Sequence, residues 1–308
     1  MPQLTLPRRH AALLAVVLLA LTAAPAAARA EAPGPREREA ARLSTGGVVR
    51  LGPRAPAAAR RVVALAPSLT DIVVALGHAD RLVGVTRYDD APEVARLPRV
   101  GGFLDPSPEA VLALRPDLVL WITDAGAIAP VEKIAALGIP VLALPVVSVA
   151  DVLAAARVVG VALGDAPAGE RLASRLEADV SRVRERARGL KPVRVLFVVG
   201  REPLVVAGPG SYPDELLRLL GATNVAQGAR PWPVYPVERA VADDPEVVID
   251  GAVLEPKEGL ARLTAIPAVR RGRVVRLQDD GALRPGPRLT RALDELFRAL
   301  HPEAPVRQ

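Results

Sequence analysis

Residues 166–190 read APAGERLASRLEADVSRVRERARGL, and this stretch decides how the chain is organised. Apolar residues recur in it at steps of four, four and three, at Leu172, Leu176, Val180 and Val183. Most other positions carry Arg, Glu or Ala, and neither Pro nor Gly occurs between residues 170 and 187. This pattern is typical of one long helix with a narrow apolar stripe. We predict a helix over 167–190, which would be roughly 30 Å long at about 1.5 Å per residue.

The sequences on the two sides of this helix resemble each other. Residues 109–119 read EAVLALRPDLV and residues 238–248 read ERAVADDPEVV. Each begins with Glu, reaches Pro seven residues later and continues through an acidic residue into an apolar run. We therefore predict the same unit of short helix, Pro and buried strand in both halves of the chain.

The first thirty residues have the features of a secretory signal peptide. Two arginines precede an apolar run over 11–21, and Ala28-Arg29-Ala30 offers a cleavage site. The run is shorter than the about 20 residues that a membrane span needs. Because the chain has no Cys, we expect neither a lipid-attachment cysteine nor a disulfide. We predict a protein that is soluble outside the cytoplasm after cleavage near Ala30, and leave open whether export uses the general or the twin-arginine route.

The remaining chain divides into four parts. Residues 31–60 are rich in Pro, Ala and Arg and are interpreted as a tether with an edge hairpin around 43–51. We place an N-terminal lobe at 61–148, a helical linker that contains the long helix at 149–190, and a C-terminal lobe at 191–308. In both lobes short Val-rich runs alternate with helical segments. The predicted fold class is α/β: two lobes, each with a mainly parallel sheet covered by helices, bridged by one long spine helix.

The sequence lacks the motifs of the common enzyme classes. We find no G-x-S-x-G, no phosphate-binding G-x-x-x-x-G-K-[ST] and no dinucleotide-binding G-x-G-x-x-G after a strand. Only two histidines remain after cleavage, so no metal site and no catalytic residue is predicted. Ser68 follows an apolar run, and we predict that it caps a helix over 69–76, with Asp71 in the first turn. A net charge of +6, lowered to +3 by cleavage, argues against nucleic-acid binding.

Aromatic residues are few and their positions are informative. Six of the eight fall at strand ends or in loops rich in Pro and Gly: Tyr88, Phe103, Trp121, Tyr212, Trp232 and Tyr235. A single aromatic residue in such a place normally covers the edge of the core. Six together indicate stacking surfaces for a large flat ligand.

Several segments together resemble a known family. They are RVVALAPSLTDIVVALG, VGVTRYDDAP, PEAVLALRPDLVLW, LGIPVLAL, PWPV followed by ERAV, and GPRLTRALDEL. Their order and spacing resemble the periplasmic substrate-binding proteins of ABC importers for cobalamin, haem and ferric siderophores, from about residue 61 to residue 300. The resemblance implies one ligand bound in a cleft between two lobes. We expect the single long helix to limit closure to a motion of small amplitude.

Within that superfamily the details look most like the cobalamin binders. The resemblance implies ligand binding by Tyr88, Phe103, Trp121, Trp232, Asp280 and Arg284. Phe103 stands where the pattern has Trp, and Trp121 is displaced by one position. Aromatic side chains would pack on the corrin ring, while Asp280 and Arg284 would hydrogen-bond its amides. The spacing of the last two is equally that of an ordinary i, i+4 surface pair.

The repeated Glu gains a role from the same resemblance. Glu109 and Glu238 match the exposed glutamates that dock into arginine-bearing pockets of a dimeric permease in the inner membrane. Either residue alone is also explained by the helix dipole. The resemblance thus implies a monomer without a catalytic cofactor, which delivers cobalamin as a transported ligand.

Three alternatives remain open. The same fold could bind haem, with Tyr88, Tyr212 or Tyr235 as an axial ligand. It could bind an anionic ferric siderophore through Arg87, Arg201, Arg230 and Arg284. A tetrapyrrole metal chelatase is the alternative from another class, although two histidines are few for it. A purely structural exported domain would leave the loop aromatics unexplained.

Overall fold

The computed structural model describes residues 47–125, 128–228, 230–253 and 257–303. The predicted signal peptide and residues 31–46 of the predicted tether lie outside the described residues. Within the described ranges, no helix is both long enough and apolar enough to cross a membrane.

The first sheet has five strands in the order β1-β5-β4-β2-β3. They are β1 (Val49–Leu51), β2 (Val62–Ala64), β3 (Leu82–Gly84), β4 (Leu118–Ile122) and β5 (Val141–Leu144). All are parallel except β1, which adds an antiparallel edge to β5. Val62 and Ala64 enter one apolar cluster and Val63 enters another. Both faces of the sheet are therefore buried, as a continuous apolar run predicts.

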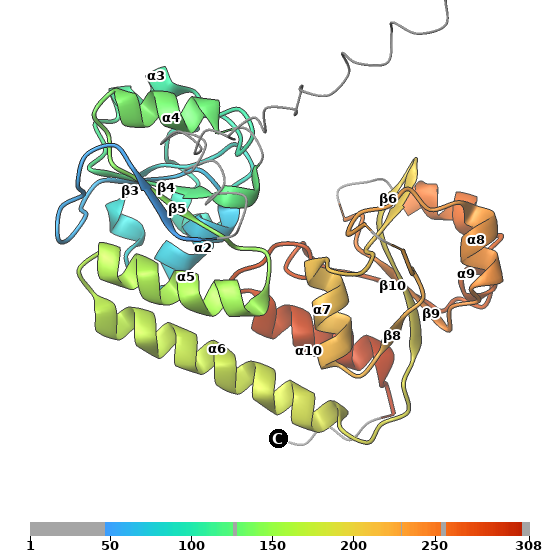
Figure 1. Cartoon of the computed structure of the whole chain (residues 1–308). Helices are drawn as coiled ribbons and strands as arrows, with labels where there is room; N and C mark the ends of the chain where they lie inside the picture. The colour runs from blue at the N-terminus through green and yellow to red at the C-terminus, as the bar shows by residue number, and fades with distance from the viewer. Residues whose placement is uncertain (1–46, 126–127, 229, 254–256, 304–308) are drawn as a thin grey trace, which may run out of the picture. The chain divides into compact units, whose positions relative to one another are not determined.

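Helices cover both faces of this sheet. They are α2 (Pro67–Ala75), α3 (Pro108–Ala113), α4 (Ala129–Ala136) and α5 (Val149–Ala162), with short 3₁₀ turns η1 (Ala79–Arg81), η2 (Pro92–Val94) and η3 (Thr123–Ala125) in the connections. Val111 of α3 and Ile134 of α4 share a cluster with Val63, whereas Ile72 of α2 and Val152 of α5 pack in the other cluster. Figure 1 shows α3 and α4 on one side of the strands and α2 and α5 on the other.

The stretch quoted first forms α6 (Ala166–Ala187), so the predicted spine helix is present and ends three residues earlier than expected. Asp165 caps its start by accepting a hydrogen bond from the backbone N of Ala168 at 3.0 Å. The helix ends where Gly189 takes a left-handed φ of 77°. Its predicted stripe is buried at Leu172, Leu176 and Val183. α6 packs along α5 and also contacts α7 (Tyr212–Leu219) and α10 (Leu289–Leu300).

The second sheet has the order β10-β9-β6-β7, with β8 beside β6. Its strands are β6 (Arg194–Arg201), β7 (Leu204–Val206), β8 (Thr223–Asn224), β9 (Val247–Asp250) and β10 (Val274–Arg276). Only β7 is antiparallel. The other elements of this lobe are α8 (Val237–Ala242), η4 (Lys257–Leu263) and α9 (Pro267–Arg270). The predicted fold class, two mainly parallel α/β lobes and a long bridging helix, is confirmed.

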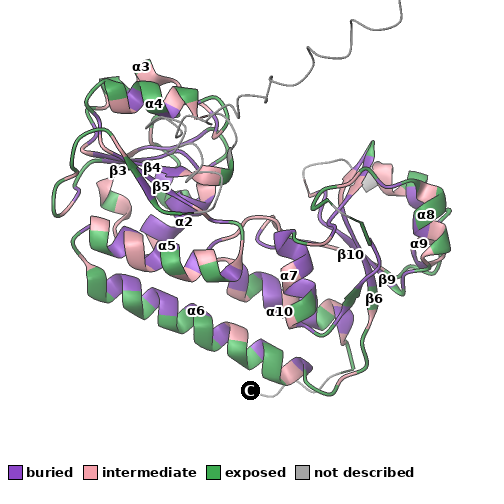
Figure 2. Cartoon of the chain, in the orientation of Figure 1, coloured by how far each residue is buried: buried purple, intermediate pink, exposed green. Residues whose placement is uncertain are grey.

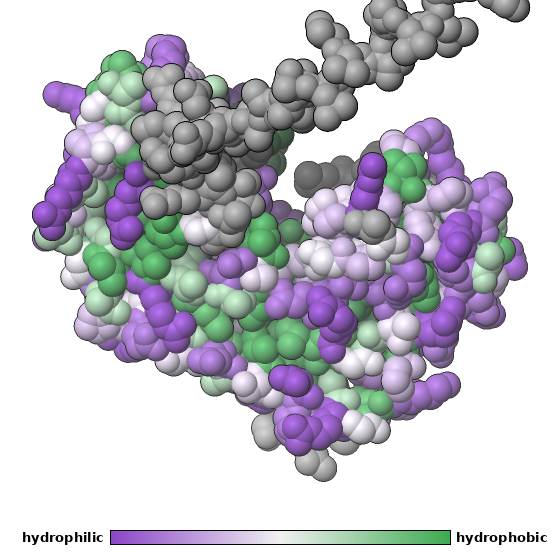
Figure 3. Space-filling model, viewed as in Figure 1, coloured by the Kyte–Doolittle hydropathy of each residue, from purple (hydrophilic) through white to green (hydrophobic). Residues whose placement is uncertain are grey.

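Burial and hydropathy follow this architecture. Most strand residues are buried, β10 only in part, and the helices expose their outer faces (Figure 2). In the same view, hydrophilic side chains dominate the surface over α8 and α9 (Figure 3). The side chains that face solvent on α8 are thus available for polar contacts with a partner.

The same unit of short helix, Pro and strand occurs in both lobes. α3 is followed by Arg115, Pro116 and β4, and α8 is followed by Asp244, Pro245 and β9. Arg115 and Asp244 have left-handed backbones, with φ of 47° and 36°, and they are the non-glycine residues with positive φ in the described chain. β4 and β9 then pair in parallel with β2 and β6.

Candidate ligand-binding site

Two predicted aromatic residues lie together on the first lobe. The rings of Tyr88 and Phe103 are 5.7 Å apart, with an interplanar angle of 58°. Tyr88 is 49% exposed, so one side of this pair faces solvent. The guanidinium of Arg87 lies 5.1 Å from the Tyr88 ring and donates to Asp105 at 2.6 Å. This geometry provides an aromatic surface that a flat ligand can stack on.

Gly102 leaves the space for this arrangement. A Cβ at this position would lie 2.5 Å from Asp105 Oδ1, 2.9 Å from Arg87 Nη2 and 3.0 Å from Tyr88 Cε2. Any larger residue would therefore displace the Tyr88 ring or break the ion pair beside it.

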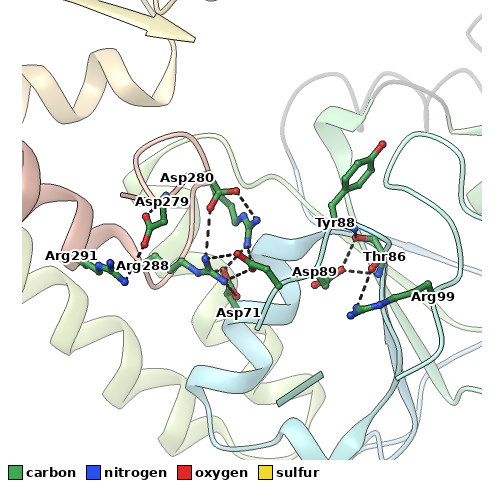
Figure 4. A network of polar contacts seen from close by, with 12 residues as sticks. Asp71, Thr86, Tyr88, Asp89, Arg99, Asp279, Asp280, Arg288 and Arg291 are labelled. Carbon is green, nitrogen blue, oxygen red and sulfur yellow. Dashed lines mark hydrogen bonds and ion pairs between the residues drawn. The ribbon is translucent and has the colours of Figure 1, made fainter. Parts of the chain in front are cut away.

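The loop that carries Tyr88 is held by local hydrogen bonds. Asp89 Oδ2 accepts from the backbone N of Thr86 at 2.7 Å and from its hydroxyl at 2.5 Å. The hydroxyl of Thr86 in turn accepts from the backbone N of Tyr88 at 3.2 Å, and Arg99 donates to the Thr86 carbonyl. Figure 4 shows the Tyr88 ring pointing away from this group. The phenol is thus presented outward on a fixed backbone.

Asp280 and Arg284 belong to a five-residue ionic cluster with Asp71, Asp90 and Arg288. Arg284 donates to Asp280 Oδ2 at 2.6 Å, to Asp90 Oδ1 at 2.9 Å and to Asp71 Oδ2 at 3.5 Å. Arg288 contacts Asp71 (Figure 4) and also Asp90. Asp71 lies on α2, and Asp90 lies two residues after Tyr88. The ion pairs therefore connect Asp280 and Arg284 to the loop that carries Tyr88.

The carboxylates of this cluster have different environments. Burial raises the pKa of Asp71, which is only 8% exposed, although Arg288 and Arg284 act against that rise. Asp90 is half exposed, and its hydrogen bond from Arg288 holds its pKa well below the ordinary range despite some desolvation. Asp280 Oδ1 is buried and accepts no hydrogen bond within the described residues. Asp280 therefore has unused capacity to accept a hydrogen bond.

Two residues of α2 differ from the sequence prediction: Ser68 does not cap the helix, and Asp71 has ionic partners that were not predicted. The N-cap of α2 is Ala66, with Pro67 in the first turn and no side-chain cap. Ser68 is buried, and Asp71 pairs with arginines more than 200 residues away. An acidic residue within an apolar helix needs a buried cationic partner, and that signal was readable in the sequence.

Trp232 lies in the second lobe and is 47% exposed. Two backbone hydrogen bonds hold its loop. The backbone N of Gly208 donates to the carbonyl of Pro231 at 2.8 Å, and the backbone N of Val206 donates to the carbonyl of Pro233 at 3.2 Å. A Cβ on Gly208 would lie 3.1 Å from the Pro233 ring. Among the residues described, the Trp232 ring stacks on neither of the first-lobe aromatics. It forms a separate aromatic surface.

Trp121 is a predicted ligand residue that the structure contradicts. Its side chain is 1% exposed and lies in the apolar cluster with Val131 and Ile134 of α4. Helices cover both faces of the sheet, and the face of β4 that carries Trp121 packs against α4, so the ring is enclosed in the core. Its Nε1 is buried without a hydrogen-bond partner in the described part of the chain. Trp121 therefore supports the fold and does not present its ring to a ligand.

Glu109 and Glu238 occupy matching places, each in the first turn of its helix and exposed to solvent. Glu109 accepts from Lys133 Nζ at 2.6 Å, and this hydrogen bond lowers its pKa. Ser107 caps the helix of Glu109, whereas α8 has Pro236 at the cap. Both carboxylates are accessible to a partner.

Several residues named for the alternative ligands are buried. Tyr212 and Tyr235 are 2% and 6% exposed, and burial raises the pKa of both phenols. Arg201 is buried and donates to Asp250 at 2.7 Å. Tyr88 is therefore the one of the three proposed axial tyrosines that faces solvent, and Arg201 does not face an anionic ligand.

A hollow of ≈ 840 Å³ lies elsewhere, between the loop after β1 and α5. Its walls include Pro53, Ala55, Val158 and Val161, and none of the predicted ligand residues lines it. We place the candidate site at the aromatic and ionic residues because they combine stacking surfaces with hydrogen-bonding groups, whereas the lining of the hollow includes arginines but no aromatic residue.

The chain is similar to periplasmic binding proteins in both sequence and fold. The family model described as periplasmic binding protein matches residues 62–280. A vitamin B12-binding protein of Vibrio parahaemolyticus is 25% identical over 240 residues, which cover 77% of this chain and 87% of that protein. A solved periplasmic haem-binding protein from Roseiflexus sp. RS-1 has a TM-score of 0.73 and 30% identity, covering 80% of this chain and 99% of that chain. A periplasmic vitamin B12-binding protein of Vibrio cholerae has a TM-score of 0.71 and 24% identity, covering 80% and 98%.

Proposed function

We propose, from the premise that this chain belongs to the periplasmic binding protein family, that it captures cobalamin and delivers it to an ABC importer. The membership rests on a family match that spans well over half of the chain. Relatives named as vitamin B12-binding proteins support the choice of ligand. The protein would act in the periplasm as a binding protein, without a catalytic step.

The observation that carries the proposal is the joined set of aromatic and ionic groups. Tyr88 and Phe103 offer a stacking surface, and the ion pairs of Asp90 connect their lobe to Asp280 and Arg284. A corrinoid has a broad apolar ring and neutral amides at its edge. Aromatic side chains can pack on the apolar ring, and charged side chains can hydrogen-bond the amides.

The charge balance of the cluster favours a ligand with neutral polar groups. Each of its two arginines already contacts at least two carboxylates. An anionic ligand would have to compete with Asp71 and Asp90 for them. Amides need no such displacement, and the buried Oδ1 of Asp280 could accept from an amide N–H after a small adjustment of the loop.

Haem is the second candidate. Its support is the exposed phenol of Tyr88, which could serve as an axial ligand, and the 30% identity to a protein described as haem-binding. The two candidates assign different roles to the same residue. With cobalamin the Tyr88 ring stacks, whereas with haem its oxygen binds iron.

Titration of the purified mature protein separates these candidates. Cyanocobalamin, haemin and a ferric siderophore would be added in turn and followed by calorimetry and absorbance. We expect saturable 1:1 binding of cyanocobalamin, with most of the affinity kept in Tyr88→Phe because the ring remains. Binding of haemin alone, with loss of affinity in Tyr88→Phe, would overturn the choice of cobalamin.

We also propose that Glu109 and Glu238 dock on a dimeric permease. Their support is the equivalent position of the two carboxylates in the repeated unit, because a two-fold partner presents two equivalent sites. Both carboxylates are exposed to solvent, so a cationic pocket can reach them, and at Glu109 it would compete with Lys133.

A further inference from the structure

Arg288 immediately precedes α10 and reaches two carboxylates of the first lobe. Its Nε and Nη2 lie 3.0 and 3.2 Å from the oxygens of Asp71. Its Nη2 and Nη1 also donate to Asp90 at 2.6 and 3.1 Å. One planar guanidinium thus makes a two-pronged contact with each of two carboxylates, a geometry that Lys cannot reproduce.

These contacts connect Arg288 to the residues that are proposed to touch the ligand. Asp90 is two residues from Tyr88 in the chain, and it also accepts from Arg284 Nη1 at 2.9 Å. Arg284 uses its other nitrogen, Nη2, for Asp280 at 2.6 Å. Arg288 Nη1 lies 3.7 Å from Asp280 Oδ1, so Arg288 is near all three carboxylates of the cluster.

Removal of Arg288 would leave three carboxylates to share one guanidinium. Asp71 is the most buried of them, at 8% exposed, and so has the least access to water as a substitute partner. Arg284 would be drawn toward Asp71 and Asp90, and its hydrogen bond to Asp280 would weaken. The loop of Tyr88 would lose the stronger of its two anchors on the second lobe.

We propose that Arg288 is a positioning residue for ligand binding, which fixes Asp90 and the loop of Tyr88 relative to the Asp280–Arg284 pair. Arg288 acts through Asp90, which lies two residues after Tyr88, and through Asp71, which shares both arginine partners with Asp90. The inference rests on the proposed function, because it concerns residues that we assign to the ligand.

The first test needs no ligand. Amide hydrogen exchange of Thr86, Tyr88 and Asp89 would be measured in the intact protein, in Arg288→Gln and in Arg298→Gln. Arg298 is an exposed arginine on α10, ten residues further along, and provides the matched control. We expect exchange of these loop amides to be about tenfold faster in Arg288→Gln, as local opening becomes easier, and unchanged in the control. Unchanged exchange in Arg288→Gln would overturn the proposal.

The second test measures affinity for cyanocobalamin by calorimetry. Loss of a partly buried ionic contact should weaken binding about tenfold in Arg288→Gln, and Arg288→Lys should lie between that variant and the unchanged protein. The double variant Arg288→Gln with Asp90→Asn should bind about as weakly as the weaker single variant, because both changes remove the same contact. Additive losses would contradict the assignment. Arg288→Lys keeps the charge and serves as the test if Arg288→Gln does not fold.

The two proposals fail separately. If the unchanged protein binds haemin and not cyanocobalamin, the same variants are measured with haemin, and only the proposed ligand is wrong. If cyanocobalamin binds with equal affinity to the unchanged protein and to all Arg288 variants, the proposed ligand stands and the positioning role is wrong.

Discussion

Arg61 and Arg194 make equivalent contacts in the two lobes. Arg61, just before β2, donates to the carbonyls of the two residues before Pro116 at 2.7 and 3.1 Å. Arg194, at the start of β6, donates to the carbonyls of the two residues before Pro245. Each guanidinium therefore ties the end of a glutamate-bearing helix to a central strand. The C-terminal ends of the helices that carry Glu109 and Glu238 are thus held in the same way on the two sheets.

The first prediction concerns transport. The double change Glu109→Arg with Glu238→Arg should abolish uptake, because two cationic side chains would face cationic pockets, and should leave the affinity for cyanocobalamin unchanged. Uptake would be measured in cells that depend on the protein, and affinity by calorimetry. Glu132→Arg with Glu177→Arg reverses two other exposed glutamates and is the matched control. Normal uptake by the first double variant would rule out docking through these residues.

The second prediction separates the two tryptophans. Trp121→Ala should lower the free energy of unfolding by about 3–5 kcal/mol, as for large core residues, whereas Trp121→Phe should cost less because it also removes an unsatisfied N–H. Folded Trp121→Phe should bind cyanocobalamin normally. Trp232→Ala should do the opposite, with near-normal stability and about tenfold weaker binding, since an exposed stacking ring is lost. Denaturant unfolding and calorimetry measure the two quantities, and a binding defect in Trp121→Phe would restore it as a ligand residue.

The third prediction concerns the space beside Tyr88. Gly102→Ala should weaken cyanocobalamin binding, because the new methyl group would approach Asp105 Oδ1 to 2.5 Å and must displace the aromatic side chain or the ion pair. Gly228→Ala is the control, since nothing lies within 4 Å of a Cβ there and its φ is not positive. Equal affinities of the two variants would show that the position of Tyr88 does not matter for binding.

The fourth prediction concerns the left-handed residues of the repeat. Arg115→Gly should stabilise the protein by about 1 kcal/mol, because Gly adopts positive φ without the clash of a Cβ. Asp244→Gly should gain less, since Asp tolerates this conformation better and Asp244 is paired with Arg271. Arg115→Ala provides the control for loss of the side chain. Urea unfolding would measure all three, and a destabilised Arg115→Gly would contradict the strain.

The fifth prediction concerns acid stability. The folded state lowers the pKa of Asp90, so its stabilising contribution is present above the ordinary value of 3.8 and is lost as the pH falls below it. Asp90→Asn should therefore lower the melting temperature at pH 7. The difference in melting temperature between the variant and the unchanged protein should become smaller toward pH 3. Burial raises the pKa of Asp71. Loss of its proton as the pH rises past the ordinary value of 3.8 therefore lowers the free energy of unfolding. Melting curves between pH 3 and 7 would test this, and a constant difference for Asp90→Asn would contradict it.

The sequence predicted the fold better than the site, for physical reasons. Helix and strand periods are local, so the stripe of Leu172, Leu176 and Val183 and the Val-rich runs were sufficient to place α6 and the parallel strands. The repeat around Pro116 and Pro245 was visible for the same reason. Helix ends were less accurate, because Pro67 rather than Ser68 opens α2.

The site depends on contacts between distant segments, which local patterns do not contain. Asp280 and Arg284 were predicted as an isolated pair, whereas the structure adds Asp71 and Asp90, which lie 190 or more residues away in the chain, and Arg288, which immediately precedes α10. The prediction for Trp121 came from a resemblance displaced by one position, and the burial of its ring depends on packing against Val131 and Ile134 of α4, which the strand pattern does not contain.

The contact between α5 and α6 limits where the molecule can bend. A Cβ on Gly160 would lie 2.7 Å from the Cα of Gly169, so the two helices touch backbone to backbone with no side chain between them. Helices in such close contact cannot slide or tilt without a backbone collision. α5 and α6 must therefore move together as one rigid unit. Any hinge therefore lies beyond the far end of α6, at the turn and coil residues 188–193 that lead into β6, or in the loop that carries Asp280 and Arg284.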